Sequence, residues 1–266
     1  MIAFRRFSTI LLLVLAYTSI QAQSGISVSP PRNYFTVAAG QSESKKILVS
    51  NPSKTTRLDL AVSLNDWNYD SYGSNLIHDA GTLPNSCANW ISILPQSYFS
   101  LAPGETHEME LIVSPPPTIS DPIPVHTAML YITQINPEDA VNEHGANIKV
   151  SVRTGIKIYQ RYPGARLPQL EIDNFSYSDT KDLLLEFTNN GNIWADGTLN
   201  CELINQETGA KTQLSDAVFY TIPNDSRKII IALPDDLAPG KYIATAILNY
   251  GDDATIKMAE LSFSHE

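Results

Sequence analysis

The residue types that most often carry catalysis or hold a metal are thinly spread along this chain of 266 residues. No two histidines stand at the i, i+2 or i, i+4 spacing that directs two ring nitrogens at one metal ion. The sequence also lacks a nucleophile elbow, a phosphate-binding glycine loop and an acidic calcium loop. We therefore expect no enzyme and no metal or cofactor site. Surface positions are predicted for the five histidines, which are His78, His107, His126, His144 and His265.

Two cysteines, Cys87 and Cys201, fall in different halves of the chain. A disulfide between them would suit an oxidising compartment. Two residues so far apart do not make a disulfide scaffold, however, and free cysteine is among the most buried residue types. The sequence therefore favours two buried, unpaired thiols.

The N-terminus has the three parts of a secretory signal peptide. Two arginines precede an apolar run, Ile10–Tyr17, and small and polar residues follow it up to Ala22. Because the run is too short to span a bilayer, we predict residues 1–22 as a cleaved signal peptide. The expected location is the periplasm, with no membrane span after cleavage. Cleavage would change the formal charge from −10 to about −12. Such an acidic chain is a poor partner for nucleic acid.

The mature chain has an ordinary globular composition, with 43% hydrophobic and 17% charged residues, and its pattern is all-β. Short stretches rich in β-branched and aromatic residues alternate with turns, and no segment keeps a helical period. Two sets of such stretches indicate two immunoglobulin-like β-sandwich domains. The strands predicted in the first set are Ile26–Val37, Lys46–Ser50, Leu58–Trp67, Trp90–Leu94, Thr106–Val113, Ala128–Ile135 and Ile148–Tyr159. Those in the second are Leu170–Ser176, Leu183–Thr188, Thr198–Ile204, Thr212–Tyr220, Lys228–Leu233, Lys241–Asn249 and Thr255–Ser262.

Proline and glycine punctuate the segment Arg161–Pro168, which separates the two sets of strands. Domain boundaries usually fall in such exposed segments, and prolines make them semi-rigid. We therefore predict a short hinge here, with an N-terminal domain over 24–162 and a C-terminal domain over 168–266.

The strand predicted over Ile148–Tyr159 alternates apolar residues at even positions with polar or small residues at odd positions. One interpretation is that its apolar row, Ile148, Val150 and Val152, fills the core of its own sandwich. Another is that the strand lies at a sheet edge and presents this row to a foreign strand. The row contains one lysine and no proline, so little blunts such an edge. The residues alone leave both interpretations open.

The segment Ile148–Arg161 resembles the last N-terminal-domain strand of the PapD-like periplasmic chaperones that assemble pili. In that family an alternating strand is followed by a threonine, a lysine and an aromatic-Arg-Pro ending, which Thr154, Lys157 and Arg161-Tyr162-Pro163 match. The run Ser27–Phe35, with Arg32 inside it, is similar to the first strand of the family. Further matches occur at Ala102–Glu105, Asp121–Pro124 and Ala128–Tyr131, so the resemblance covers roughly residues 26–163. It is faint over the second domain.

The resemblance implies a function without catalysis or cofactors. Pilus subunits lack their last strand, and such a chaperone lends them one of its own. Here Ile148, Val150 and Val152 would enter the open groove of the subunit. Arg32 and Lys157 would hold the C-terminal carboxylate of the subunit in the cleft between the domains. The resemblance also implies an outer-membrane usher as a second partner and a self-capping dimer.

One feature departs from the pattern of the family, and the position of Lys157 along its strand raises a separate geometric difficulty. The Arg-Glu-Ser triplet of the family is replaced by His126-Thr127-Ala128, so an acidic residue thought to help lock the domains together is missing. Lys157 also has the opposite parity to Ile148 and Val150, so we expect a bulge or twist at Gly155 to turn it towards the cleft. The alternative function is a secreted structural or adhesive protein with two immunoglobulin-like domains, in which the long strand would be covered.

Overall fold

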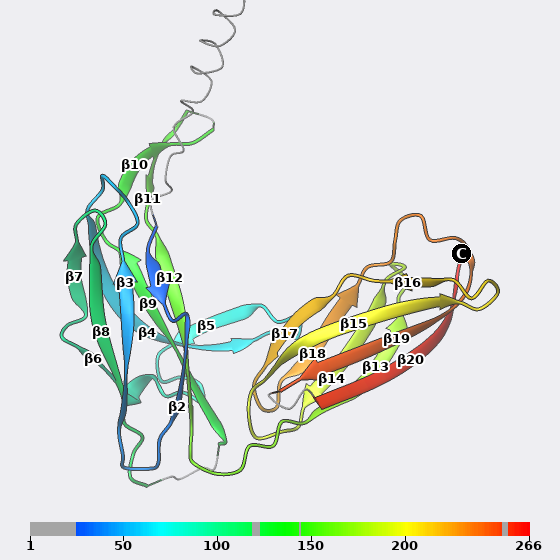
Figure 1. Cartoon of the computed structure of the whole chain (residues 1–266). Helices are drawn as coiled ribbons and strands as arrows, with labels where there is room; N and C mark the ends of the chain where they lie inside the picture. Colours follow the sequence, from blue (N-terminus) through cyan, green and yellow to red (C-terminus); the bar gives the residue numbers. More distant parts are fainter. Residues whose placement is uncertain (1–24, 119–122, 144, 252–254) are drawn as a thin grey trace, which may run out of the picture.

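The structure is a computed structural model that describes residues 25–118, 123–143, 145–251 and 255–266. The predicted signal peptide, residues 1–22, lies outside these ranges, and so does His144. Within them, no helix is long and apolar enough to cross a membrane. The regular structure there is almost entirely β, as predicted, apart from the short 3-10 turn η1 (Ala88–Trp90). Figure 1 shows two sandwiches joined by a short segment.

The first half of the chain forms a sandwich of two sheets. One has the order β1-β3-β8-β6, and the other has the order β2-β12-β9-β4-β5, with β7 also paired to β4. A separate two-stranded ribbon, β10-β11, extends from one end of this sandwich (Figure 1). The strands are β1 (Ser27–Ser29), β2 (Arg32–Thr36), β3 (Glu43–Ser50), β4 (Leu58–Tyr69), β5 (Asn75–Asp79), β6 (Ile91–Leu94), β7 (Tyr98–Leu101), β8 (Thr106–Val113), β9 (Val125–Gln134), β10 (Glu138–Val141), β11 (Asn147–Val150) and β12 (Arg153–Arg161).

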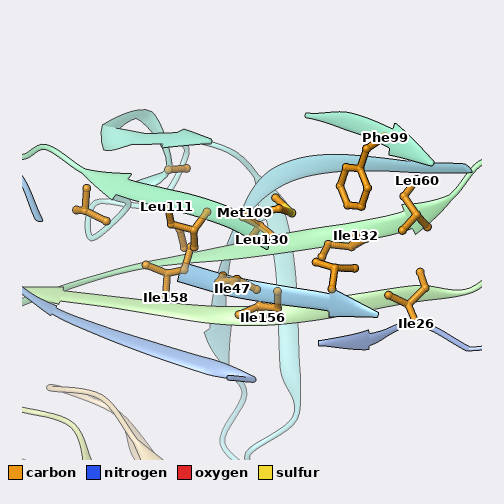
Figure 2. Packing of buried hydrophobic residues seen from close by; sticks show 14 of the residues in the cluster. Ile26, Ile47, Leu60, Phe99, Met109, Leu111, Leu130, Ile132, Ile156 and Ile158 are labelled. Atoms are coloured by element: carbon orange, nitrogen blue, oxygen red, sulfur yellow. The ribbon is translucent and has the colours of Figure 1, made fainter. Parts of the chain in front are cut away.

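Alternation along these strands builds the core between the two sheets. Successive residues of a strand point to opposite faces, so every second side chain faces inward. Figure 2 shows the inward-facing side chains meeting between the sheets. Among them are Ile47, Leu60, Met109, Leu111, Leu130, Ile132, Ile156 and Ile158, all of which are fully buried.

The strand boundaries differ from the sequence prediction at several places. The segment Ile26–Val37 is two strands rather than one, because Pro30 and Pro31 interrupt it and neither can donate a backbone hydrogen bond. The expected single strand Ile148–Tyr159 is also two strands, β11 and β12, with a break at Ser151 and Val152. The prediction missed β5, β7 and β10.

The second half forms another sandwich, which confirms the predicted fold class. Its sheets have the orders β13-β14-β18 and β16-β15-β19-β20, and β17 also pairs with β15. Each predicted strand of this half overlaps an observed one, although Thr212–Tyr220 is split between β16 and β17. The strands are β13 (Leu170–Tyr177), β14 (Leu183–Asn189), β15 (Ala195–Asn205), β16 (Lys211–Gln213), β17 (Ala217–Thr221), β18 (Ser226–Ile231), β19 (Gly240–Tyr250) and β20 (Thr255–His265).

Two kinds of contact hold the sandwiches against each other. A cluster of apolar side chains, which we call the junction cluster, lies where they meet. It contains Trp67, Tyr69, Val125, Met129, Tyr159, Ile193 and Ile222. In addition, the β4–β5 turn reaches from the first sandwich to β18 of the second (Figure 1). There the backbone N–H of Lys228 donates to the carbonyl oxygen of Ser71 at 2.7 Å.

Candidate functional site: a cation pair at the end of a strand edge

Arg32 and Lys157 lie side by side on adjacent strands. β2 and β12 are parallel, and their register places Arg32 directly beside Lys157. Register partners in a sheet project to the same face. The neighbours of Lys157 along β12, Ile156 and Ile158, are buried in the core of the first sandwich. The cation pair, Arg32 and Lys157, therefore projects from the opposite face, which is turned towards the second sandwich.

Lys157 needs no bulge to reach the cation pair, because its odd position in β12 already places its side chain on the outer face of this sheet. The pairing of β12 with β9 runs in unbroken register from Arg153 to Arg161, so the irregularity expected at Gly155 is absent. Gly155 instead leaves room for its neighbours, because an added Cβ would approach Met129 Sδ and Tyr131 Cε1 to 3.0 Å. The expectation was wrong because it assumed that the cation and the apolar row must share one face.

Aromatic rings enclose the ammonium group of Lys157. Its Nζ donates to the Tyr69 hydroxyl at 2.7 Å and lies 4.1 Å from the ring centroids of both Trp67 and Tyr69. The faces of these rings are negative and attract a cation. Burial, together with the nearby positive charge of Arg32, lowers the pKa of Lys157 to about 8. The two rings and the Tyr69 hydroxyl therefore hold the ammonium group of Lys157 in place, but they offset its positive charge less than a carboxylate would.

Arg32 contacts the second sandwich directly. Its guanidinium lies 3.8 Å from the ring centroid of Tyr220, and its Nη1 lies 3.5 Å from Oδ2 of Asp196 on β15. Burial raises the pKa of the Asp196 carboxyl, and Arg32 and Lys157 oppose that rise. A cavity of about 650 Å³ opens beside these groups, lined by Tyr34, Trp194 and Asp196 among others.

A third cation, Arg227 of β18, also belongs to this junction. Its side chain is 3% exposed, and its Nη2 lies 2.8 Å from Oδ2 of Asp225. Its Nη1 donates to the carbonyl oxygen of Asp70 in the first sandwich at 2.8 Å, and its guanidinium stacks over Tyr69. Asp196 and Arg227 thus supply charged links between the sandwiches in a protein without the expected acidic residue near His126. Neither residue was predicted from the sequence as part of a site.

The edge of β12 is only partly occupied. β2 pairs with it from Lys157 to Arg161. Over Arg153–Ile156, the edge that faces away from β9 has no strand partner within the described part of the chain. β11 pairs only with β10 in the same described ranges. An unpaired edge therefore leads along β11 and the start of β12, and it ends at the cation pair.

The predicted apolar row divides at the break between β11 and β12. Ile148 is 39% exposed and Val150 is 43% exposed on the ribbon, whereas Val152 is partly buried against the core of the first sandwich. The break coincides with hydrogen bonds that involve Gln134. The backbone N–H of Gln134 donates to the carbonyl oxygen of Val152 at 2.8 Å, and the Ser151 hydroxyl donates to the carbonyl oxygen of Gln134. The exposed apolar pair thus consists of Ile148 and Val150. Exposure of this pair does not fit the alternative in which the long strand is covered.

The remaining candidates for chemistry are structural. Cys87 and Cys201 are buried and unpaired, as predicted, and burial raises the pKa of the Cys201 thiol to about 11. No group of side chains suited to a metal ion occurs among the described residues. The prediction of surface histidines was wrong for His126, which is 5% exposed and packs against the ring of Trp90.

Comparisons with known proteins find likeness in structure rather than in sequence. No protein-family model matches the chain, and no curated protein matches it either. The structure is similar to the E. coli chaperone DraB, with 15% identity, a TM-score of 0.49 and coverage of 91% of this chain and 96% of that chain. It is similar to a chain of the Salmonella enterica SafA pilin–SafB chaperone complex, with 13% identity, a TM-score of 0.46 and coverage of 91% and 97%. It is also similar to the periplasmic chaperone SfaE, with 11% identity, a TM-score of 0.42 and coverage of 90% and 98%.

The class of protein found in these comparisons is the one that the sequence resembles. The three solved structures named above contain chaperones, and each match covers about 90% of this chain. At identities of 15% and below, this likeness concerns the fold.

Proposed function

We propose that this protein is a periplasmic assembly chaperone that binds strand-deficient pilus-like subunits by adding one of its own strands to them. The observation that carries the proposal is the unpaired edge of β11 and early β12, which ends at two adjacent cations. An open edge offers backbone N–H and C=O groups to an extended partner. A subunit that lacks its last strand exposes a complementary edge and an apolar groove.

The point where β2 begins defines where a bound strand has to end. Because β2 occupies the edge of β12 from Lys157 onwards, a strand added before that point cannot continue past Arg32. A C-terminal residue that stops there presents its carboxylate to the cation pair. Arginine and lysine both bind carboxylates through charge-assisted hydrogen bonds. Arg32 and Lys157 are therefore the proposed anchor for the C-terminus of the subunit.

The exposed apolar side chains provide the second part of the proposed binding. Ile148 and Val150 project from β11, and each would contribute about 1.5–3 kcal/mol if fully buried in the groove of a subunit. Val152 belongs to the same proposed row, although its side chain already packs partly against its own sandwich. The proposal thus combines pairing along an edge, apolar side chains in a groove and a charged anchor at one end.

The location and organisation proposed here follow from the sequence. Residues 1–22 are the proposed signal peptide, which would deliver the protein to the periplasm. The proposed domain limits remain 24–162 and 168–266. The solved complex of the SafA pilin with the SafB chaperone supports subunits of this kind as the partner class. An outer-membrane usher remains a further proposed partner.

An Arg32→Ala/Lys157→Ala double variant is expected to lose at least nine-tenths of subunit capture, because the bound strand loses its anchor. The test is affinity purification of the tagged protein from periplasmic extract of its own organism, with the captured chains identified by mass spectrometry. The parent protein should retain small β-rich subunits. Lys211→Ala, which removes an exposed cation paired with Glu202, is the matched control and should capture as the parent does. Undiminished capture by the double variant would exclude the anchor.

Binding of a free C-terminal carboxylate should weaken as the pH rises above about 8. The pKa of Lys157 is about 8 in the free protein, and a bound carboxylate favours the protonated form and raises it. Affinity should be constant below that pH and fall by up to about tenfold per pH unit above it. The probe is an N-acetylated peptide of about ten residues with alternating valine and serine, titrated against the protein by tryptophan fluorescence.

Lys157→Arg is the matched control for this pH profile. Arginine stays protonated throughout the range, so the profile of this variant should be flat between pH 7 and about 10. The peptide itself does not titrate in this range, because its only ionisable group is the C-terminal carboxylate, which is already ionised. Any change of affinity with pH therefore comes from the protein. An equal fall of affinity in the parent and in Lys157→Arg would show that Lys157 is not the titrating group.

A further inference from the structure

The proposed anchor already contains a carboxylate from the protein itself. Asp196 Oδ2 lies 3.5 Å from Arg32 Nη1, and the two side chains are 34% and 30% exposed. This contact is long and single for an ion pair. The other charged pair of the junction, Arg227 with Asp225, is shorter at 2.8 Å and almost inaccessible, with 3% and 12% exposure. The Arg32–Asp196 contact is therefore the one that a ligand can reach and replace.

The two cations of the anchor are held in different ways. Lys157 is held by the rings of Trp67 and Tyr69, and in the described part of the chain no carboxylate lies within ion-pair distance of its Nζ. Arg32 is held by the carboxylate of Asp196 and by the ring of Tyr220. An incoming carboxylate thus meets one cation without an acidic partner and one that is already paired.

We propose that Asp196 is an internal competitor for the C-terminal carboxylate of the subunit, and that capture exchanges one carboxylate for the other on Arg32. This inference rests on the proposed function. A guanidinium offers a planar fork that binds a carboxylate with two parallel hydrogen bonds. The single 3.5 Å contact with Asp196 falls short of that geometry, so an incoming carboxylate with better alignment displaces it. The free energy needed to displace Asp196 from Arg32 is thereby subtracted from the binding free energy of the subunit.

Selectivity for a free carboxylate follows from the same exchange. A neutral C-terminal amide gains nothing from Lys157 that offsets the loss of the Arg32–Asp196 contact. A carboxylate gains contacts with both cations. A carboxylate can therefore displace Asp196 from Arg32, whereas a neutral chain end leaves the Arg32–Asp196 contact in place.

The test is an Asp196→Asn variant, which keeps the shape of the side chain and removes its charge. We expect it to bind the N-acetylated valine–serine peptide with a free carboxylate about fivefold more tightly than the parent protein. The amidated form of the same peptide should gain less. Glu202→Gln is the matched control, since it removes a paired carboxylate on the same strand, away from the cation pair, and should bind as the parent does.

Two further arms separate the inference from the proposed function. In an Arg32→Ala background, Asp196→Asn should bring no gain, because the competition requires Arg32. Unchanged or weaker peptide binding by Asp196→Asn alone would overturn the competitor role. If Lys157→Ala binds the peptide as the parent does, or if neither the parent nor Asp196→Asn binds it, the anchor itself is excluded and the proposed function fails with it.

Discussion

An Arg227→Met variant is expected to lose about 3–5 kcal/mol of unfolding free energy, the usual effect of removing one partner from a buried ion pair. Arg227 is 3% exposed, and its guanidinium serves Asp225, the carbonyl oxygen of Asp70 and the carbonyl oxygen of Tyr220. Methionine fills part of the volume but donates no hydrogen bond. The carboxylate of Asp225 and both carbonyl groups would be left without their cationic partner.

The matched control for this variant is the next residue on the same strand. Lys228 is partly exposed and pairs with Glu186 at the surface. Exposed ion pairs contribute little to stability, so Lys228→Met should unfold within the error of the parent value. Urea unfolding followed by tryptophan fluorescence gives both values. A second variant, Asp225→Asn/Arg227→Met, should recover part of the loss, because it no longer buries an unpaired charge. Equal stability of Arg227→Met and Lys228→Met would contradict the prediction.

An Ile148→Asp/Val150→Asp variant should capture subunits at least about a hundredfold more weakly than the parent. Each replaced side chain would otherwise contribute about 1.5–3 kcal/mol inside the groove of a subunit. Each aspartate must in addition lose its hydration shell in an apolar groove, which adds to the loss. About 3 kcal/mol in total already corresponds to more than a hundredfold in affinity. The fold should be unaffected, because both native side chains are about two-fifths exposed.

A control on the opposite face of the ribbon separates loss of the apolar row from general damage to β10-β11. Val141 pairs with Asn147 and is 64% exposed, and it lies on the other face from the Ala140–Ile148 pair. Val141→Asp places a charge on the same ribbon without touching the proposed row, so it should capture subunits as the parent does. Affinity purification with calibrated amounts of a captured subunit measures all three proteins. If both variants lose capture equally, the proposed face is wrong.

The fold class could be predicted from the sequence because the information is local. Alternation of apolar residues and the placing of turns identified both sandwiches and most of their strands. The break between β11 and β12 could not be predicted in this way, because it coincides with hydrogen bonds that Gln134, on another strand, donates to the Val152 carbonyl oxygen and accepts from the Ser151 hydroxyl. Nothing in Ile148–Tyr159 itself signals that contact.

Only part of the candidate site could be predicted from the sequence. Arg32 and Lys157 came from family resemblance, whereas Asp196 and Arg227 come from distant strands whose local sequence gives no sign of a shared site. A signal for the aromatic enclosure was present. The apolar residues of β4 change from even positions, such as Leu58 and Leu60, to odd positions at Trp67 and Tyr69. A change of parity along one strand indicates that its outer face becomes covered, here by the second sandwich.

The contact between the β4–β5 turn and β18 has a consequence for the thermodynamics of recognition. Ser71 and Asp70 of the first sandwich accept hydrogen bonds from Lys228 and Arg227 of the second, so the junction is tethered on the side away from the linker segment. Two sandwiches that are connected both by this contact and by the linker segment have little freedom to rotate against each other. A partner that settles between them then finds a pre-organised receptor and loses little of its binding free energy to immobilising one sandwich against the other. Affinity in such a receptor depends mainly on complementarity to a geometry that folding has already set.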